Sequence, residues 1–420
     1  MLDHRPQLSH ATAPRDRGGQ PSLSIVVSDL SSQGAGRWGG AVRPFLLGQA
    51  LQSQGYGVEI VGFSTEAASQ TVVNQLPITA IPVTSPYLGP QDVSALCRHL
   101  TGDMIYAYKL KPSSFGLALL HRLRHRRPVL LDIDDWELSW HGGDHYRYRP
   151  NPRQLARDLL KSTGALHHPD HPFYLQLIER LVAKADLVTT HNGFLQRRFG
   201  GTIIPNGKDT ELFNPDRHDA QASRAAYGLS AYRVLMFPGA PRPYKGVEDL
   251  LQALDILNKP DLKLVIVGGS PYDDYDRTLL ERWPQHIIHL GKQPYTDMPN
   301  VIAAAHVVVV PQRQTPAAQA QFPLKLTDGM AMAKPILATR VGDIPDILNG
   351  CGYLADADAP AQLAAQITQI FADYDRALDL GRQARDRCLT HYSMAAMGEG
   401  LHQAIHQTLL KSTPWRSTVP

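Results

Sequence analysis

The sequence predicts an α/β protein built from two doubly wound parallel sheets, each covered by helices. Short apolar runs alternate with longer amphipathic runs, and the alternation restarts after residue 215. The length of 420 residues also suits two or three domains of ~150 residues each. We therefore expect a disordered leader at 1–21, a first domain at 22–205, a second at 206–390, a helix at 391–412 that crosses back to the first domain, and a tail at 413–420.

In the first half, apolar and β-branched runs predict the strands, and amphipathic runs predict the helices between them. The strands are expected at 22–28, 56–63, 104–108, 128–134 and 185–191. A glycine-rich turn and helix at 39–55, and helices at 113–126 and 171–184, are expected between them. Pro205 and the Asn206-Gly207 pair argue against a helix or central strand at 202–215 and suit a hinge.

The second half repeats the pattern, with strands at 232–239, 262–269, 286–291, 306–312 and 335–342. Helices are expected at 246–258, 297–305, 324–333, 361–372, 376–389 and 394–410. In doubly wound sheets, ligands bind beyond the carboxyl ends of the strands. Two such domains facing each other form a cleft between them, which is a favoured ligand site.

Composition and charge exclude several classes of protein. With 43% hydrophobic and 19% charged residues, the chain is not globally disordered, and a net charge of +3 argues against a nucleic-acid partner. The three cysteines, Cys97, Cys351 and Cys388, form no CxxC pair, which argues against a disulfide framework. The leader has no apolar segment typical of a signal peptide, and no apolar run approaches ~20 residues. We therefore expect a cytoplasmic protein.

The segment 238–254 carries two cations beside a helix start. Gly239 ends a strand, Arg242 and Lys245 lie in the following loop, and a helix begins near Gly246. A helix N-terminus offers unpaired N–H groups and partial positive charge, and arginine adds forked donors, so this arrangement suits a diphosphate. An ordinary solvated loop remains the alternative.

The segment 321–339 predicts a second helix start at the same edge. Pro323 ends a loop, the helix begins at Leu324, and Asp328 lies one turn into it. A carboxylate there can accept two ribose hydroxyls, as acidic residues do in dinucleotide-binding folds. Alternatively, Asp328 only complements the helix dipole.

The order of these segments resembles the nucleotide-sugar half of retaining GT-B glycosyltransferases of the large family 4. The motifs are RxxKG after a strand, then VIVGG, then a strand, loop and helix ending in MAxxxP. The first half adds Gly39-Gly40, KADLVTTHNGFLQRRF and IPNGKDTELFNP, the last of which is similar to the family's PNGVD segment. The resemblance covers most of the chain and implies a GT-B fold with two Rossmann-like domains facing across a cleft.

The resemblance also implies an activity: transfer of a hexosyl group from a nucleoside-diphosphate sugar to an acceptor hydroxyl, with retention and without a bound metal or other cofactor. Arg242 and Lys245 match the donor-diphosphate ligands, and Asp328 matches the second Glu of the E-x7-E motif, which binds ribose. Leu326 and Thr327 would offer N–H groups, and glycines 39 and 40 would allow close approach. The donor-binding set is then Gly39, Gly40, Gly239, Arg242, Lys245, Gln293, Pro323, Leu324, Lys325, Leu326, Thr327 and Asp328.

Three positions depart from the family pattern. The first Glu of the motif falls at Ala320, the second is the shorter Asp328, and the family's His on the loop after strand 128–134 is replaced by Asp134 and Asp135. We predict Arg242, Lys245, Asp134 and Asp135 as the catalytic residues. A non-catalytic sugar-nucleotide-binding relative and a GT-B-type sugar-nucleotide epimerase remain alternatives. A dehydrogenase is disfavoured because no GxGxxG follows the first strand.

Several other patterns keep more than one interpretation. The acidic run Asp132, Asp134, Asp135 and Glu137 could hold Mg²⁺, but contact of Asp134 or Asp135 with the acceptor or donor sugar is favoured, and no metal site is predicted. The histidines show no HExxH pattern. The aromatic and basic loop 140–161 suits sugar stacking, an anionic lipid head or a plain surface excursion. The basic run 121–128 is either a membrane patch or a helix end. The acceptor stays open between a lipid, a glycan and a small metabolite, and peripheral contact with an anionic membrane stays open as well.

Overall fold

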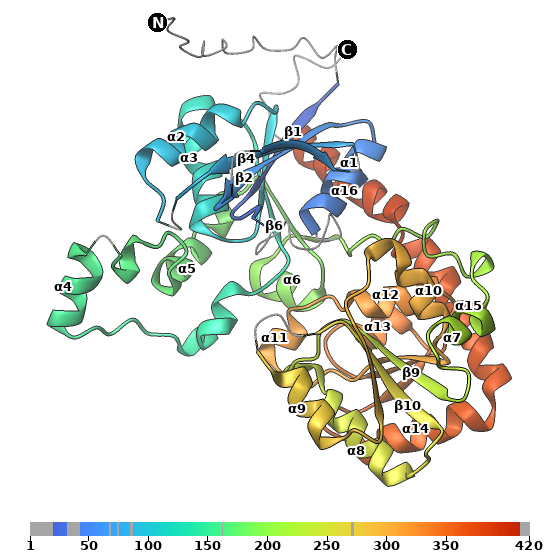
Figure 1. Cartoon of the computed structure of the whole chain (residues 1–420). Helices are drawn as coiled ribbons and strands as arrows, with labels where there is room; N and C mark the ends of the chain where they lie inside the picture. The colour runs from blue at the N-terminus through green and yellow to red at the C-terminus, as the bar shows by residue number, and fades with distance from the viewer. Residues whose placement is uncertain are drawn as a thin grey trace, which may run out of the picture.

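The computed structural model describes residues 20–31, 43–66, 69–73, 75–84, 87–161, 163–269 and 273–411. Two parallel-stranded sheets, each flanked by helices, form the two lobes seen in Figure 1. The predicted turn at Gly39 and Gly40, most of the predicted leader and the predicted tail lie outside the described residues. Pro21, the last residue of that leader, accepts a hydrogen bond from the Gly57 N–H at 3.0 Å, so this residue is part of the first domain and not of a disordered leader.

The first sheet has eight strands in the order β3-β4-β2-β1-β5-β6-β7-β8. All neighbours are parallel except β3 and β4, which are antiparallel. Leu23 and Ile25 of β1 pack on one face and Val26 on the other, so both faces are buried, as parallel sheets require. The strands are β1 (Ser22–Val27), β2 (Gly57–Ser64), β3 (Ser69–Val73), β4 (Leu76–Pro82), β5 (Met104–Tyr108), β6 (Val129–Ile133), β7 (Leu187–Thr190) and β8 (Thr202–Ile203).

The helices of the first domain are α1 (Arg43–Ser53), α2 (Pro90–His99), α3 (Leu117–His125), α4 (Pro152–Leu160), α5 (Pro172–Glu179) and α6 (Gly193–Phe199). A long insertion between β6 and β7 contains two 3-10 turns (Glu137–His141 and Gly143–His145), α4 and α5. The sequence analysis missed β3, β4, α2, α4 and α6. Part of the expected hinge is the short strand β8, whose neighbour Ile204 donates its N–H to the Thr190 carbonyl.

The second sheet has six strands, all parallel, in the order β11-β10-β9-β12-β13-β14. The strands are β9 (Arg233–Pro238), β10 (Leu262–Val267), β11 (Ile287–Leu290), β12 (Val307–Val310), β13 (Ile336–Thr339) and β14 (Tyr353–Ala355). The helices are α7 (Ala220–Ala226), α8 (Val247–Leu257), α9 (Tyr275–Arg282), α10 (Met298–Ala303), α11 (Pro316–Gln319), α12 (Leu324–Ala331), α13 (Ile344–Leu348), α14 (Pro360–Ala372) and α15 (Tyr374–His391). The predicted helices at 246–258 and 324–333 thus correspond to α8 and α12.

The last helix, α16 (Met394–Lys411), returns to the first domain and packs against α1 (Figure 1). Met397 and Leu401 of α16 belong to the same buried cluster as Leu47 and Leu51 of α1. Lys208 lies where the chain first crosses between domains, and its backbone pairs with the segment just before α16 through the Tyr392 carbonyl and the Met394 N–H. The two crossings therefore run side by side.

Candidate active site

The two domains meet where the strands of each sheet end. His191 and Asn192, directly after β7, contact the carbonyls of Ala320 and Gln319, which follow β12, at 2.9 and 3.0 Å. On the other side of the junction, the Trp140 ring packs edge-on against Tyr244, with ring centroids 5.8 Å apart. Because carboxyl ends of parallel strands are where α/β sheets bind ligands, this junction is the candidate site.

The loop after β9 places two cations at this edge. Arg242 lies 3.4 Å from Asp273 and keeps 23% of its side chain exposed, while Lys245 donates to the Ala240 carbonyl at 2.8 Å. Gly246 has a φ of +65°, and a Cβ there would lie 1.7 Å from the Pro311 carbonyl oxygen, so only glycine permits this close turn. Burial, together with Arg242, lowers the pKa of Lys245 to about 8.

A third cation, Lys325, comes from the first turn of α12. Its ammonium lies 4.3 Å from the centre of the Phe237 ring and is almost fully buried. Burial first, and then Lys245, hold the pKa of Lys325 well below its ordinary value. Within the described residues, neither Lys245 nor Lys325 forms an ion pair. Asp328 opposes this shift without forming an ion pair with Lys325, so a cluster of cations with lowered pKa values remains, and such a cluster favours an anionic ligand.

The start of α12 differs in detail from the expectation. The Leu326 N–H, expected to face a phosphate, donates to the Pro323 carbonyl at 2.8 Å, and the Thr327 hydroxyl bonds to the Leu324 carbonyl. The first turn is tightened in this way because Pro323 caps the helix without a side-chain acceptor. In the part of the chain that the structure describes, the N–H groups of Leu324 and Lys325 donate to no such carbonyl and are the ones left for an anion.

Asp328 contacts a residue that the sequence analysis did not single out. Its carboxylate forms a short ion pair with Lys208, a residue of the crossing segment whose side chain is only 7% exposed. The Lys208 ammonium also lies 3.4 Å from the Tyr295 hydroxyl and 3.2 Å from the centre of the Phe213 ring. Burial alone would lower the pKa of Lys208, but Asp328 and Tyr295 outweigh it, so the pKa is raised and the lysine stays charged.

Two other predicted donor residues are less engaged. Gly239 adopts a φ of +116° with open space where a Cβ would lie. Gln293 is half-buried and donates to the Gly291 carbonyl at 3.2 Å. The predicted role of Gly239 and Gln293 in donor binding therefore stays a prediction.

On the first-domain side, Asp134 and Asp135 follow β6. Asp134 accepts a hydrogen bond from the Tyr108 hydroxyl, and Asp135 accepts one from the Trp140 indole at 3.0 Å. The second carboxylate oxygen of each is buried without a hydrogen-bond partner, although that of Asp134 lies 3.5 Å from the Lys109 ammonium. Burial, opposed by Lys109 and reinforced by Glu137, raises the pKa of Asp135 to about 6. Both oxygens lack a hydrogen-bond donor and can accept hydroxyls from a ligand.

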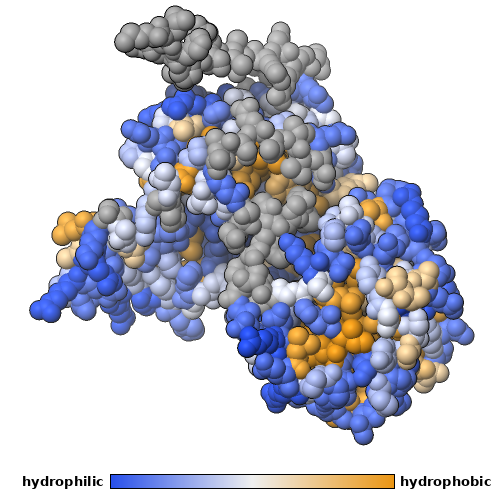
Figure 2. Space-filling view, in the orientation of Figure 1, coloured by the Kyte–Doolittle hydropathy of each residue, from blue (hydrophilic) through white to orange (hydrophobic). Residues whose placement is uncertain are grey.

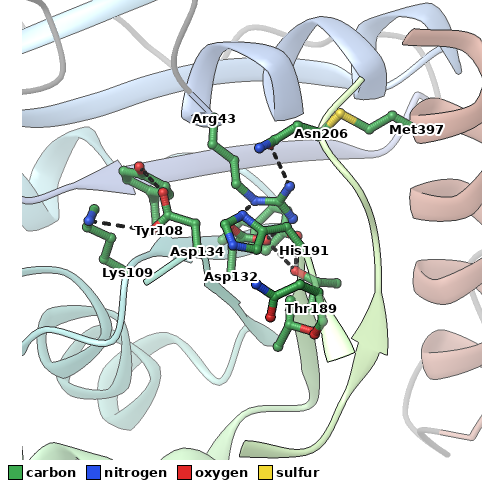
Figure 3. Close-up of polar contacts among 12 residues, drawn as sticks. Arg43, Tyr108, Lys109, Asp132, Asp134, Thr189, His191, Asn206 and Met397 are labelled. Carbon is green, nitrogen blue, oxygen red and sulfur yellow. Dashed lines mark hydrogen bonds and ion pairs between the residues drawn. The ribbon is translucent and has the colours of Figure 1, made fainter. Parts of the chain in front are cut away.

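Beneath these carboxylates lies a buried network centred on Arg43 (Figure 3). Arg43 donates twice to Asp132, at 2.6 and 2.7 Å, and once to Asn206 of the crossing segment at 2.9 Å. Thr189 of β7 completes the set by donating to Asp132 at 2.7 Å. This network joins α1, β6, β7 and the interdomain crossing, so Asp132 has a structural partner.

Glu137 is likewise paired, with Lys109 at 2.6 Å and Lys111 at 3.2 Å. Burial would raise the pKa of Glu137, but the two lysines outweigh it and bring the pKa to about 2. Within the described ranges, no three His, Cys, Asp or Glu side chains are grouped so that they could hold a metal ion.

His191 is a further residue that the sequence analysis did not single out. It lies beside Asp134 at the end of β7 (Figure 3), and its Nε2 lies 2.9 Å from the Ala320 carbonyl. Burial, together with Arg43, lowers its pKa to about 4, so the ring is neutral at pH 7. A carbonyl only accepts, so Nε2 carries the proton and the buried Nδ1, which has no hydrogen-bond partner, is an acceptor. Its place at the carboxyl end of an expected strand was the only signal.

Comparison with known proteins agrees with this geometry. The sequence model of the family described as glycosyl transferases group 1 matches residues 232–373, which include the loop with Arg242 and Lys245 and the helix with Asp328. This part of the second domain is similar to the group 1 glycosyl transferases. The resemblance to family 4 enzymes is thereby confirmed.

Among curated relatives, this glycosyltransferase is 24% identical to D-inositol 3-phosphate glycosyltransferase of Corynebacterium jeikeium, over 91% of the chain and 94% of the relative. It is also 25% identical to a GDP-mannose-dependent monoacylated alpha-(1-6)-phosphatidylinositol monomannoside mannosyltransferase of Corynebacterium glutamicum, over 54% of the chain and 63% of that relative.

Solved structures show the same architecture. Sucrose-phosphate synthase from Thermosynechococcus elongatus superposes with a TM-score of 0.69 at 16% identity, covering 94% of this chain and 100% of that one. HepE of Anabaena in complex with UDP-glucose gives 0.68 at 16% identity, covering 92% and 99%. These likenesses confirm the GT-B fold of the glycosyltransferase.

The departures from the family pattern now have a structural setting. Ala320 is fully buried, and its carbonyl holds His191 of the opposite domain. Asp328 pairs with Lys208. Lys208 stands at the position where the family's PNGVD segment has valine. No helix in the described part of this glycosyltransferase is both long and apolar enough to cross a bilayer.

Proposed function

We propose that this glycosyltransferase moves a hexosyl group from a nucleoside-diphosphate sugar to an acceptor hydroxyl, with retention of configuration. The observation that carries the proposal is the set of cations beside the α12 N-terminus. Burial and a neighbouring cation lower the pKa of both lysines, Arg242 acting on Lys245 and Lys245 acting on Lys325, and neither lysine forms an ion pair among the described residues. A diphosphate relieves this repulsion, and the same groups stabilise the negative charge that develops on the leaving nucleotide. Because these cations take that role, the proposal includes no bound metal.

Asp328 is proposed to bind the nucleotide ribose, and Lys208 to position it. Asp is one methylene shorter than the family's Glu, and the Lys208 ammonium fixes the orientation of this shorter carboxylate. Since Lys208 also hydrogen-bonds through its backbone to Tyr392 and Met394, the carboxylate is attached to both interdomain crossings. Movement of the two domains about these crossings would therefore change the position of the Asp328 carboxylate at the proposed ribose site.

The first domain is proposed to bind the acceptor and the transferred sugar. The unsatisfied oxygens of Asp134 and Asp135 and the Nδ1 acceptor of His191 suit hydroxyl donors. The family's retaining course, in which the leaving phosphate assists attack from the same face, requires only that these groups orient the hydroxyl and that the junction exclude water. The free cysteines fit the proposed cytoplasmic location.

Thermal unfolding of the full chain with UDP, GDP, ADP and their sugars tests donor binding, because a ligand that binds only the folded state raises Tm. We expect one nucleotide class to raise Tm, and diphosphates to do so more than monophosphates. No shift with any nucleotide would refute the proposal.

Donor turnover, followed with and without candidate acceptors, then separates the alternatives. Binding with neither hydrolysis nor transfer would indicate a non-catalytic relative, an alternative that the apolar Ala320 at a carboxylate position keeps open. A product formed without any acceptor would indicate an epimerase.

A further inference from the structure

Helix α4, in the insertion between β6 and β7, extends away from both domains (Figure 1). Asp158 is its only buried residue and accepts a hydrogen bond from the Tyr148 hydroxyl at 2.9 Å. The leucines of α4 face outward instead: Leu155 is 38% exposed, Leu159 51% and Leu160 83%. Figure 2 shows a hydrophobic patch at the tip of this arm. An isolated helix of this length is marginal in water, so its apolar face needs a partner.

The residues of α4 are arranged as in a helix that lies on an interface. Leu155 and Leu159 are four residues apart and share one face, and Leu160 extends it. Arg153, Arg157 and Lys161 follow one side of this face, and all three are exposed. Arg157 forms an ion pair with Asp158 at 3.3 Å, yet 58% of its side chain remains accessible. An apolar face edged by cations is the pattern that binds the boundary between lipid head groups and acyl chains.

Charge complementarity selects the occupant of this face. A second copy of the chain, packed leucine to leucine, would bring two rows of like charges together, which is unfavourable. An anionic bilayer takes up leucines and pairs with arginine and lysine at the same time. The helix has no acidic side chain on its exposed surface, since Asp158 is turned inward.

The same insertion reaches the acceptor side of the site. Trp140, near its start, donates to Asp135 and packs on Tyr244 of the second domain. Between Trp140 and α4, the chain passes through only the 3-10 turn Gly143–His145 and an extended stretch. One continuous segment of the insertion therefore links α4, and any surface that α4 binds, to the carboxylates on the proposed acceptor side.

We propose that α4 docks this enzyme on an anionic lipid bilayer and that the acceptor hydroxyl belongs to a molecule of that bilayer. The second clause rests on the proposed glycosyl transfer, whereas the first does not. Docking uses the leucine face for insertion and the basic edge for attraction to anionic head groups. The active-site junction then lies at the end of the arm that contacts the membrane.

Sedimentation of the full chain with vesicles tests docking. The vesicles contain phosphatidylcholine alone or phosphatidylcholine with phosphatidylglycerol. We expect binding to the anionic vesicles only, weakened by salt, and reduced on the order of tenfold or more in L155S/L159S/L160S. The matched control is I256S, because Ile256 on α8 is also 59% exposed but has no basic edge. R153Q/R157Q/K161Q should lose the preference for anionic lipid.

Nucleotide-induced rise in Tm, measured on the same variants, shows that they are folded and separates failure of docking from failure of donor binding. Equal binding of wild type and the leucine variant, or no vesicle binding at all, would overturn the proposal. Concentration-dependent dimerisation that the leucine variant abolishes would assign the face to a second copy instead. Docking with turnover of a soluble acceptor only would overturn the second clause.

Discussion

On the first-domain side of the junction, charged side chains are paired with one another, whereas on the second-domain side two lysines beside α12 have no ion-pair partner among the described residues. Arg43 is matched with Asp132 and Lys109 with Glu137, and these pairs are largely buried. Arg242 lowers the pKa of Lys245, and Lys245 lowers that of Lys325, with Asp328 opposing only the second shift. The paired side supports the shape of the site, and the unpaired side is electrostatically incomplete until an anion binds.

The comparison predicts that the paired side governs stability. Arg43→Met should leave the Asp132 carboxylate buried and unpaired, lowering the free energy of unfolding by about 3–5 kcal/mol. Urea denaturation measures the effect. Arg122→Met is the control, because Arg122 pairs with Asp186 at 3.4 Å on the surface and should cost under about 1 kcal/mol. Similar losses in both variants would contradict the structural role of the network.

The unpaired side should instead govern turnover. Lys245→Ala should lower kcat at saturating donor by about 10²–10³-fold, because a preorganised charge on the leaving diphosphate is lost. Stability should not fall, since no carboxylate is left unpaired. Steady-state kinetics against Lys259→Ala, an exposed lysine beyond the end of α8, provides the comparison. Unchanged turnover would remove Lys245 from the mechanism.

The lowered pKa of Lys245 should also appear in the pH dependence of the free energy of unfolding. Because the folded pKa of Lys245 is about 8 and its ordinary value is 10.5, the unfolded chain holds more protons between these values. Stability of the ligand-free protein should therefore rise with pH across this window, by ~1–3 kcal/mol for this lysine. Lys334 contributes a similar rise, so the difference between wild type and Lys245→Ala isolates the effect. Saturating nucleoside diphosphate should flatten it, and an identical slope in both proteins would speak against the assignment.

The smallest effect is expected at the ribose carboxylate. Lys208→Val should weaken nucleotide affinity about tenfold, as measured by calorimetry, because Asp328 loses the ion pair that orients it. Asp328→Ala should weaken it as well, with little change in kcat. The double variant K208V/D328E carries the family's residue types at both positions and should recover affinity. If Lys208→Val binds as tightly as wild type, Lys208 has no positioning role.

The sequence could predict features that consecutive residues define, but not contacts between residues far apart in the chain. The sequence predicts the loop with Arg242 and Lys245 and the start of α12. Both are local arrangements of a strand end, a loop and a helix start, which consecutive residues define. The Lys208–Asp328 pair joins positions 120 residues apart, and His191 meets Ala320 across 129. No local pattern encodes such contacts, and the sequence analysis did not single out Lys208.

Local propensity also failed where packing decides structure. The short strands β3 and β4 extend the edge of the first sheet, and α4 forms within a segment that mixes proline, arginine and aromatic residues. The run from Asp132 to Glu137 read as one acidic cluster. In the fold its members separate. Arg43 pairs with Asp132, and two lysines pair with Glu137. Asp134 and Asp135 each keep one buried oxygen without a hydrogen-bond partner, and that of Asp134 lies 3.5 Å from the Lys109 ammonium.

By itself, the sequence determined the two α/β domains, the GT-B family and the cations of the donor loop, because apolar periodicity and strand-end motifs are properties of consecutive residues. Only the tertiary structure decided which charges are neutralised and which are not, which face of α4 is left uncovered, and how the chain crossings reach the ribose carboxylate. Those features depend on residues brought together by folding, and their energies follow from burial and distance rather than from order along the chain.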